Sequence, residues 1–217
     1  MLKAVVFDLD DTLYDYKGCN TLAEEALFNA IAHEFNVPYE ESEKLLHEAK
    51  KNVKMRLGST TAASHNRLLY MQDICEQAGY NPLKYAMKLY DIYWDSMLNC
   101  MRLYGYVDPL LFEIKSRGIK TGIITDLTAH IQYRKLTALG LDGKIDFLVT
   151  SEEAGAEKPS KQIFELMMHK MRLQAGEVLM IGDNMEKDIM GAKAVGMKTL
   201  MFYEGSQFYE EARSLLG

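Results

Sequence analysis

Cysteine is scarce in this 217-residue sequence, which contains three: Cys19, Cys75 and Cys100. Their spacing matches no zinc-binding pattern, and an odd number cannot pair completely into disulfides. The scarcity argues against a disulfide-stapled secreted scaffold and against a thiolate zinc site. We expect reduced, partly buried thiols of the kind that cytosolic proteins carry.

Long hydrophobic runs and dense basic blocks are also missing. No apolar run approaches the roughly 20 residues that a membrane-spanning helix needs, and Asp8 interrupts the only candidate for an N-terminal signal segment. The formal net charge is −6, which disfavours a nucleic acid polymer or an anionic membrane as a partner. We therefore expect a cytoplasmic protein whose partner is a small molecule, while nothing in the sequence indicates an oligomeric state.

What the sequence does contain is a series of short apolar runs that predict buried strands. These runs are residues 3–8, 119–125, 145–150, 177–182 and 198–203. Helical patterns lie between the later runs, near residues 107–117, 128–139, 160–171 and 186–195. Strands that alternate with helices are typical of βαβ units and a parallel sheet. The sequence therefore predicts an α/β domain.

Residues 16–104 show a different pattern, with no convincing strand run. Apolar residues recur there at helical spacing, in segments separated by the polar breaks NVP, GSTTAASHN and GYNP. We interpret this stretch as a module of about four helices inserted into the α/β domain. The expected domains are residues 1–15 with 105–217, and residues 16–104.

Polar and acidic residues follow the predicted strands at their carboxyl ends. They are Asp8 and Asp10 at the end of the first run, Thr125 and Asp126 at the end of the second, and Asp183 and Asp188 after the fourth. Ligands of a parallel sheet bind at this edge, so we expect these side chains to converge. Converged carboxylates repel one another unless a cation joins them, and oxygen ligands without His or Cys suit Mg²⁺ ahead of Ca²⁺ or Mn²⁺. Lys158, in AEKPS, adds a second positive charge.

A single Asp-x-Asp is also typical of a solvated aspartate cluster, but an ordered set of motifs is more specific. DLDDT, IITD, EKP and GDNMEKD occur in this order along nearly the whole chain. In these motifs the sequence resembles the haloacid dehalogenase superfamily of phosphohydrolases. The helical insertion directly after the first motif resembles the α-helical C1 cap of its subfamily I. The resemblance implies a three-layer, Rossmann-like core with a parallel sheet of strand order 5-4-1-2-3 and a helical-bundle cap.

The resemblance also implies a role for each motif residue. Asp8 would be the nucleophile that becomes an aspartyl-phosphate, and Asp10 would be the general acid/base, with its backbone carbonyl reaching the metal. Thr125 and Asp126 would bind the phosphoryl group, and Lys158 would bridge the nucleophile and that group. The Mg²⁺ ligands implied by the family are Asp8, Asp10 and Asp183, with Asp188 beside them either as a further ligand or as a neighbour of the ligands.

Two residues depart from the commoner family pattern, since Asp11 replaces a Gly and Asp126 replaces an Asn. We interpret both as variants that phosphatases tolerate. The acid at Asp10 favours phosphate esters, because the dehalogenating and phosphonate-cleaving branches would not be expected to keep one there.

The function that the resemblance implies is a Mg²⁺-dependent phosphomonoesterase for a small soluble metabolite, such as a sugar phosphate or nucleoside monophosphate. One alternative is a phosphotransferase or mutase of the β-phosphoglucomutase type, which would return the phosphoryl group from Asp8 to a sugar. A second alternative is a non-catalytic binding module with the same fold. The complete motifs argue against the second alternative.

The loop GSTTAASHNR, residues 58–67, is the most polar and irregular part of the insertion. Loops held by a rigid scaffold often carry specificity, and arginine suits bidentate contacts to oxyanions. His65 and Arg67 are therefore candidates for contacting the substrate. The alternative is that Ser59 or Ser64 caps a helix while His65 and Arg67 are solvated.

Overall fold

The computed structural model describes residues 1–216, which divide into two compact units. The core unit consists of Met1–Asp15 and the chain from Arg102 onwards, and the helical unit consists of Tyr16–Met101. The core unit is therefore discontinuous in sequence. The chain leaves it directly after the first acidic motif and returns once the helical unit is complete.

Five parallel strands form the sheet of the core unit. They are β1 (Ala4–Phe7), β2 (Lys120–Thr125), β3 (Phe147–Thr150), β4 (Val178–Gly182) and β5 (Lys198–Met201). The strand order is β3-β2-β1-β4-β5, which confirms the predicted order 5-4-1-2-3. All four residues of β1 are buried in the middle of this sheet, so its sequence is a continuous apolar run rather than an alternation.

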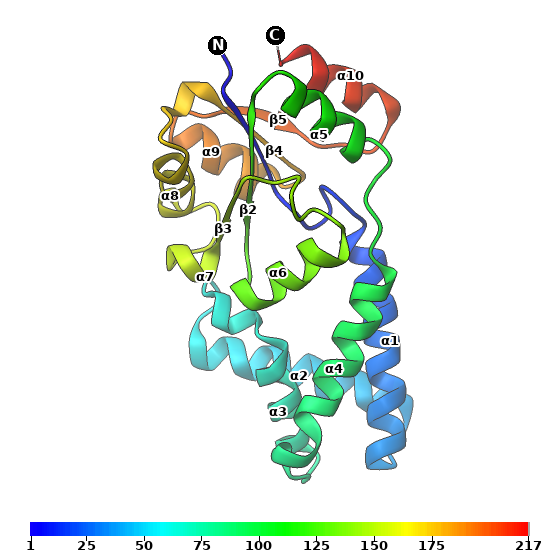
Figure 1. The fold of residues 1–217 in the computed structure, drawn as a ribbon. Coiled ribbons are helices and arrows are strands. Elements are labelled where there is room, and N and C mark those ends of the chain that lie inside the picture. The colour runs from blue at the N-terminus through cyan, green and yellow to red at the C-terminus, as the bar shows by residue number, and fades with distance from the viewer. Residues whose placement is uncertain (217) are drawn as a thin grey trace. The chain divides into compact units, whose positions relative to one another are not determined.

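Helices cover both faces of the sheet. They are α5 (Val107–Ser116), α6 (Ala129–Ala138), α7 (Ser151–Ala154), α8 (Lys161–Met171), α9 (Gly191–Ala194) and α10 (Ser206–Ser214), with the single turns η2 (Ala175–Glu177) and η3 (Met185–Met190). Figure 1 shows α8 and α9 together on one side of the strands, and α5 with α10 on the other. The core unit is therefore the expected three-layer α/β arrangement.

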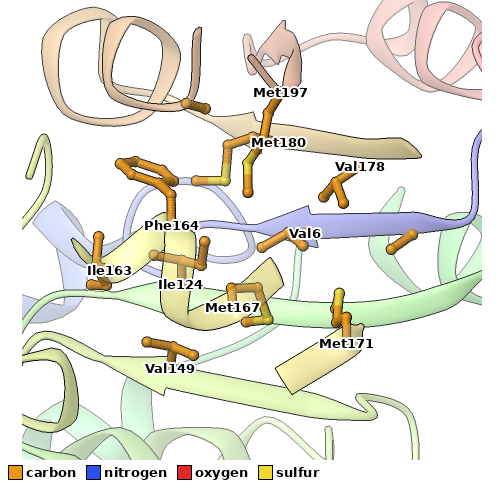
Figure 2. Packing of buried hydrophobic residues seen from close by; sticks show 12 residues of the cluster. Val6, Ile124, Val149, Ile163, Phe164, Met167, Met171, Val178, Met180 and Met197 are labelled. Atoms are coloured by element: carbon orange, nitrogen blue, oxygen red, sulfur yellow. The ribbon is translucent and has the colours of Figure 1, made fainter. Parts of the chain in front are cut away.

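The core beneath α8 explains how this helix is held against the sheet. Val6 of β1 and Ile124 of β2 face Phe164 and Met167 of α8 (Figure 2). A Cβ placed on Gly122 of β2 would overlap the methionine side chains of α8, so glycine allows the helix to approach closely. This packing fixes the start of α8, and with it the loop that carries the Glu-Lys-Pro motif.

The helical unit contains four long helices and one short turn: α1 (Tyr16–Phe35), α2 (Tyr39–Leu57), η1 (Ala62–His65), α3 (Arg67–Gln77) and α4 (Pro82–Cys100). Asn66 and Asn81 cap α3 and α4 by accepting hydrogen bonds from the backbone N–H groups of Leu68 and Leu83. The alternative that Ser59 or Ser64 caps a helix is wrong, because Thr61 precedes η1 and Asn66 precedes α3. Asparagine occupies the position from which a side chain reaches the second N–H of the helix, and Ser64 Oγ instead donates to the carbonyl of Thr61.

The three cysteines and the apolar character of the helices bear on what the composition predicts. None of Cys19, Cys75 and Cys100 forms a disulfide within the described residues, and the first two are buried, as predicted. Within residues 1–216, no helix combines the length and the apolar character that crossing a membrane requires.

Candidate active site

The carboxyl ends of β1, β2 and β4 meet at one edge of the sheet, and motif residues follow each of them. Asp8 comes directly after β1, Thr125 is the last residue of β2, and Asp183 follows β4. The strand order reverses between β1 and β4. Ligands of open parallel sheets bind at such a switch point, so Asp8 and Asp183 flank the place where a ligand is expected.

Three carboxylates form a cluster at this switch point. Asp8, Asp183 and Asp188 each place one ligand oxygen within 4.8 Å of the others. Burial raises the pKa of Asp8 well above its ordinary value, and the charges of Asp188 and Asp10 raise it further against the opposing effect of Lys158. Burial, followed by the charge of Asp188, also raises the pKa of Asp183. The cluster therefore repels further negative charge until a proton or a cation joins it.

Lys158 lies inside this cluster. Its Nζ is 2.6 Å from Oδ1 of Asp8 and 2.6 Å from Oδ1 of Asp188, and its side chain is 3% exposed. Burial alone would lower the pKa of Lys158, but the two carboxylates raise it, so the lysine is charged. Three carboxylates and one ammonium still leave two negative charges without compensation.

The donor set of the cluster fits a hard divalent cation. Carboxylate oxygens without imidazole or thiolate are the ligands that Mg²⁺ prefers, and two uncompensated charges match one such ion. Among the described residues, this cluster of Asp8, Asp183 and Asp188 does not include the side chain of Asp10. The metal contact expected from the Asp10 backbone carbonyl stays a prediction.

The loop after β4 is shaped to return Asp188 to the end of that strand. Asn184 Oδ1 accepts hydrogen bonds from the N–H groups of Glu186 and Lys187, and the Asn184 N–H donates to Oδ2 of Asp188 at 3.0 Å. The turn η3 is a π-helix, the wide turn that often marks functional sites. A Cβ on Gly182 would overlap the side chain of Asp188, so only glycine can end β4 here without displacing the carboxylate.

Asp126 is compensated by its own cation, which explains how the chain carries Asp where Asn is commoner. Lys187 Nζ is 2.8 Å from Oδ2 of Asp126, and the backbone N–H of Lys158 donates to Oδ1 at 3.0 Å. Lys187 also lies 3.5 Å from Glu157. Burial would lower the pKa of Lys187, but its hydrogen bond to Asp126 raises it. These contacts join the segments that follow β2, α7 and β4.

Thr125 is oriented by Gln132 of α6, a residue that the sequence analysis did not single out. Gln132 is fully buried, and its Nε2 donates at 2.6 Å both to Thr125 Oγ1 and to the carbonyl of Asp126. Its Oε1 is also buried and has no hydrogen-bond partner among the described residues. The side chain therefore fixes the end of β2, although its Oε1 atom gains no hydrogen bond there.

Asp10 is held by two residues that the sequence analysis also missed. Nζ of Lys135 is 2.8 Å from each carboxylate oxygen of Asp10, and the hydroxyl of Tyr14 donates to Oδ1 at 2.6 Å. Lys135 belongs to α6 and is fully buried. The available signal was its spacing, because Ile131, Lys135 and Leu139 recur every four residues and so share one helix face.

Arg67 lies within the helical unit and is not the solvated side chain of the alternative interpretation. Its guanidinium donates to the carbonyl of His65 at 2.8 Å and to the hydroxyl of Tyr16 at 2.7 Å. Its Cζ also lies within 6 Å of three aromatic ring centroids, those of Tyr70, Tyr93 and Trp94. These contacts anchor η1 to the long helices, and a contact of His65 or Arg67 with substrate stays a prediction.

Comparisons with known proteins agree with this geometry. A family model described as haloacid dehalogenase-like hydrolase matches residues 2–196. The chain is 38% identical to the ribulose-1,5-bisphosphate 5-phosphatase of Halopiger xanaduensis, over 93% of the chain and 85% of that protein. It is 31% identical to the glyceraldehyde 3-phosphate phosphatase of Methanocaldococcus jannaschii, over 94% and 86%. A crystal structure of a HAD phosphatase from Thermococcus onnurineus superposes with a TM-score of 0.75 and 25% identity, covering 100% of this chain and 98% of that one.

Proposed function

The chain belongs to the haloacid dehalogenase-like hydrolases, and from this premise we propose that it hydrolyses a small phosphorylated sugar through an aspartyl-phosphate on Asp8. The observation that carries the proposal is the bridge from Lys158 to Asp8 and Asp188 at the switch point of the sheet. A buried carboxylate with a charged lysine on it is a suitable nucleophile for a phosphate dianion, because the lysine offsets their repulsion.

In the first step, an oxygen of Asp8 attacks phosphorus while the bond from phosphorus to the sugar oxygen breaks. Asp10, in its protonated form, gives its proton to that departing oxygen, so the products are the sugar alcohol and the acyl-phosphate. Thr125 and the ammonium of Lys158 bind the phosphoryl oxygens during the transfer.

In the second step, water attacks the phosphorus of the acyl-phosphate, and Asp10 takes a proton from that water. The bond between phosphorus and the Asp8 oxygen breaks, which releases inorganic phosphate and restores the Asp8 carboxylate. Asp10 ends protonated, as it began, so one cycle consumes one phosphate ester and one water.

Asp8, Asp183 and Asp188 would hold Mg²⁺, with the backbone carbonyl of Asp10 as a further ligand. The ion, when bound, neutralises phosphoryl charge and acts as a Lewis acid. Asp188 otherwise acts by fixing the loop after β4 and by holding Lys158 in place, whereas Asp183 accepts a hydrogen bond from the hydroxyl of Thr12.

The substrate class is proposed from the relatives and from the division of the chain. The curated relatives with the highest identities above are named for phosphatases of ribulose bisphosphate and of glyceraldehyde 3-phosphate, which favours a sugar phosphate over a nucleoside monophosphate. We propose that the helical unit acts as a cap, so that small cytoplasmic metabolites enter and phosphoproteins do not. Such a cap excludes bulk water while Asp8 reacts.

The proposal is tested by incubating the purified protein and Mg²⁺ with a panel of triose, pentose and hexose phosphates, pentose bisphosphates and nucleoside monophosphates. We expect inorganic phosphate, released fastest from a sugar phosphate, and none from the Asp8→Asn variant. An isomerised sugar phosphate without free phosphate would instead identify a mutase. Binding of a phosphate ester without any product would identify a binding module.

A further inference from the structure

Lys135 is a buried cation that the reaction described above does not use. It lies on the apolar face of α6 and is fully buried. Withdrawing an ammonium from water is energetically costly, and an apolar side chain of similar volume is often as stable or more stable at such a position. Packing alone would therefore favour Leu or Met at position 135. A charged side chain there indicates that the group it binds requires the charge.

The salt bridge of Lys135 runs to Asp10, the residue proposed to move both protons. Its Nζ lies 2.8 Å from Oδ1 and 2.8 Å from Oδ2, a symmetric contact that restricts rotation of the carboxylate. The hydroxyl of Tyr14 adds a third hydrogen bond, to Oδ1 at 2.6 Å. Tyr14 is itself fixed, because it is fully buried and its backbone forms bridges with Asp10 and Leu103.

The two buried lysines, Lys135 and Lys158, pair with carboxylates that differ in exposure to solvent. The side chain of Asp10 is 23% exposed while its lysine is fully buried, so one face of the carboxylate is held and the other stays open. Lys158 contacts Asp8 and Asp188, whose side chains are 10% and 0% exposed. One lysine thus accompanies the nucleophile, and the other accompanies the carboxylate that must reach a proton on a substrate oxygen or on water.

We propose that Lys135 is a positioning residue that orients the carboxylate of Asp10 for both proton transfers of the reaction, with Tyr14 as its helper. This inference rests on the proposed phosphatase function. Orientation matters here because a proton donor or acceptor must lie within hydrogen-bond reach of the proton that it transfers, and small misplacements of a catalytic group reduce rates by large factors.

The test uses Lys135→Met, which keeps the length and volume of the side chain and removes its charge. With a sugar phosphate, we expect kcat to fall about 30-fold or more while KM changes less than about twofold, because Lys135 acts on Asp10 and not on substrate binding. Lys170→Met is the matched control, because it removes another lysine salt bridge of the core unit, that with Glu153. It should keep wild-type kinetics.

A double-mutant cycle separates positioning from a general role in the fold. In an Asp10→Asn background, Lys135→Met should cause no further loss of kcat, because the group that it orients is already gone. An equal loss in both backgrounds would overturn the proposal and make Lys135 a structural residue. The double variant also lacks both charges, so it should fold even if an unpaired Asp10 destabilises the single variant.

A second readout follows the two steps separately with p-nitrophenyl phosphate, whose leaving group departs without a proton. Lys135→Met should give a rapid burst of nitrophenolate, approaching one per active site, followed by slow turnover, because only the second step still needs Asp10. Tyr14→Phe should show the same pattern with a smaller loss, near threefold to tenfold. Equal slowing of burst and turnover would contradict the proposal.

The proposed function and this inference fail in different ways. If wild-type protein releases no phosphate from any ester in the panel, the phosphatase function is wrong. If the wild type is active and Asp8→Asn is inactive, while Lys135→Met behaves like Lys170→Met, the function stands and the role of Lys135 is wrong.

Discussion

Asp73 in the helical unit and Asp8 in the core unit are both buried carboxylates, 4% and 7% exposed, but their surroundings differ. Asp73 accepts hydrogen bonds from Asn52 and Gln77 and forms one salt bridge with Arg56. Asp8 shares one lysine with a second carboxylate and lies beside a third. A carboxylate that is satisfied by its neighbours serves the fold, whereas a cluster with charge left over is arranged for a ligand.

The largest predicted effect is the loss of activity when Asp8 is replaced. Asp8→Asn is nearly isosteric but cannot form an acyl-phosphate, so kcat should fall by at least about 1,000-fold, roughly 4 kcal/mol. The free energy of unfolding should stay the same or rise, because one of several like charges is removed. Phosphate release and urea unfolding measure the two quantities, and appreciable turnover by a folded, uncontaminated variant would refute covalent catalysis at Asp8.

The second effect concerns the metal. Asp183→Ala should weaken Mg²⁺ binding about 100-fold, roughly 2.7 kcal/mol, in a calorimetric titration. The metal-free variant should be at least as stable as wild type, since repulsion within the cluster is reduced. Asp108→Ala is the control, because that carboxylate is exposed and paired with Lys144. Full activity of the wild type after EDTA treatment would contradict the metal requirement.

The third predicted effect concerns Asp73, whose replacement should lower stability rather than activity. Asp73→Ala should lower the free energy of unfolding by about 2 kcal/mol, because three donors lose a buried acceptor. The kcat per folded molecule should change little. A loss of activity that is as large as that of Asp8→Asn, in protein shown to be folded by circular dichroism, would show that the two carboxylates do not divide into structural and catalytic roles.

The smallest predicted effect concerns Arg67, and its measurement tests whether the helical unit also selects the substrate. Arg67→Ala should raise KM for the best sugar phosphate about tenfold, roughly 1.4 kcal/mol, while p-nitrophenyl phosphate, which offers little to contact, is turned over almost normally. Lys54→Ala removes an exposed cation of the same unit and should change neither value. Equal losses for both substrates would place Arg67 in the phosphate-binding machinery or in the fold alone.

The strand pattern was predictable because each strand is a local feature of the sequence. The runs at 3–8 and 177–182 contain β1 and β4, and burial on both faces leaves no alternation to confuse the assignment. The region predicted as a helix at 186–195 differs in detail, because it begins as the π-helical η3 and continues as α9. The wide turn places Asp188 against Lys158 and the backbone N–H of Asn184, tertiary and local contacts that periodicity does not report.

The site was predictable where residues follow strand ends and where a motif, such as the one with Lys158, marks a residue. Asp8 and Asp183 could be placed together because the carboxyl ends of neighbouring parallel strands share one edge. Lys135 and Gln132 could not be placed in this way, because they belong to the helix α6 and not to a strand end. The periodicity of a helix predicts which residues share a face, but it does not predict which residues that face contacts. The capping of α3 by Asn66 rather than by a serine was likewise decided by where the helix begins.

The packing of Asp188 against Gly182 also limits how this protein can change over generations. Most positions near a reaction centre can drift through neighbouring side chains, because loops shift to absorb an extra methyl group. At the end of β4 even alanine would occupy the place of the Asp188 carboxylate, and a shift of that carboxylate would also move its partner Lys158. A lineage that substituted this glycine would therefore disturb Asp188, Lys158 and the Asp8 carboxylate that Lys158 contacts in a single step, so new substrates would have to be acquired through changes elsewhere in the chain.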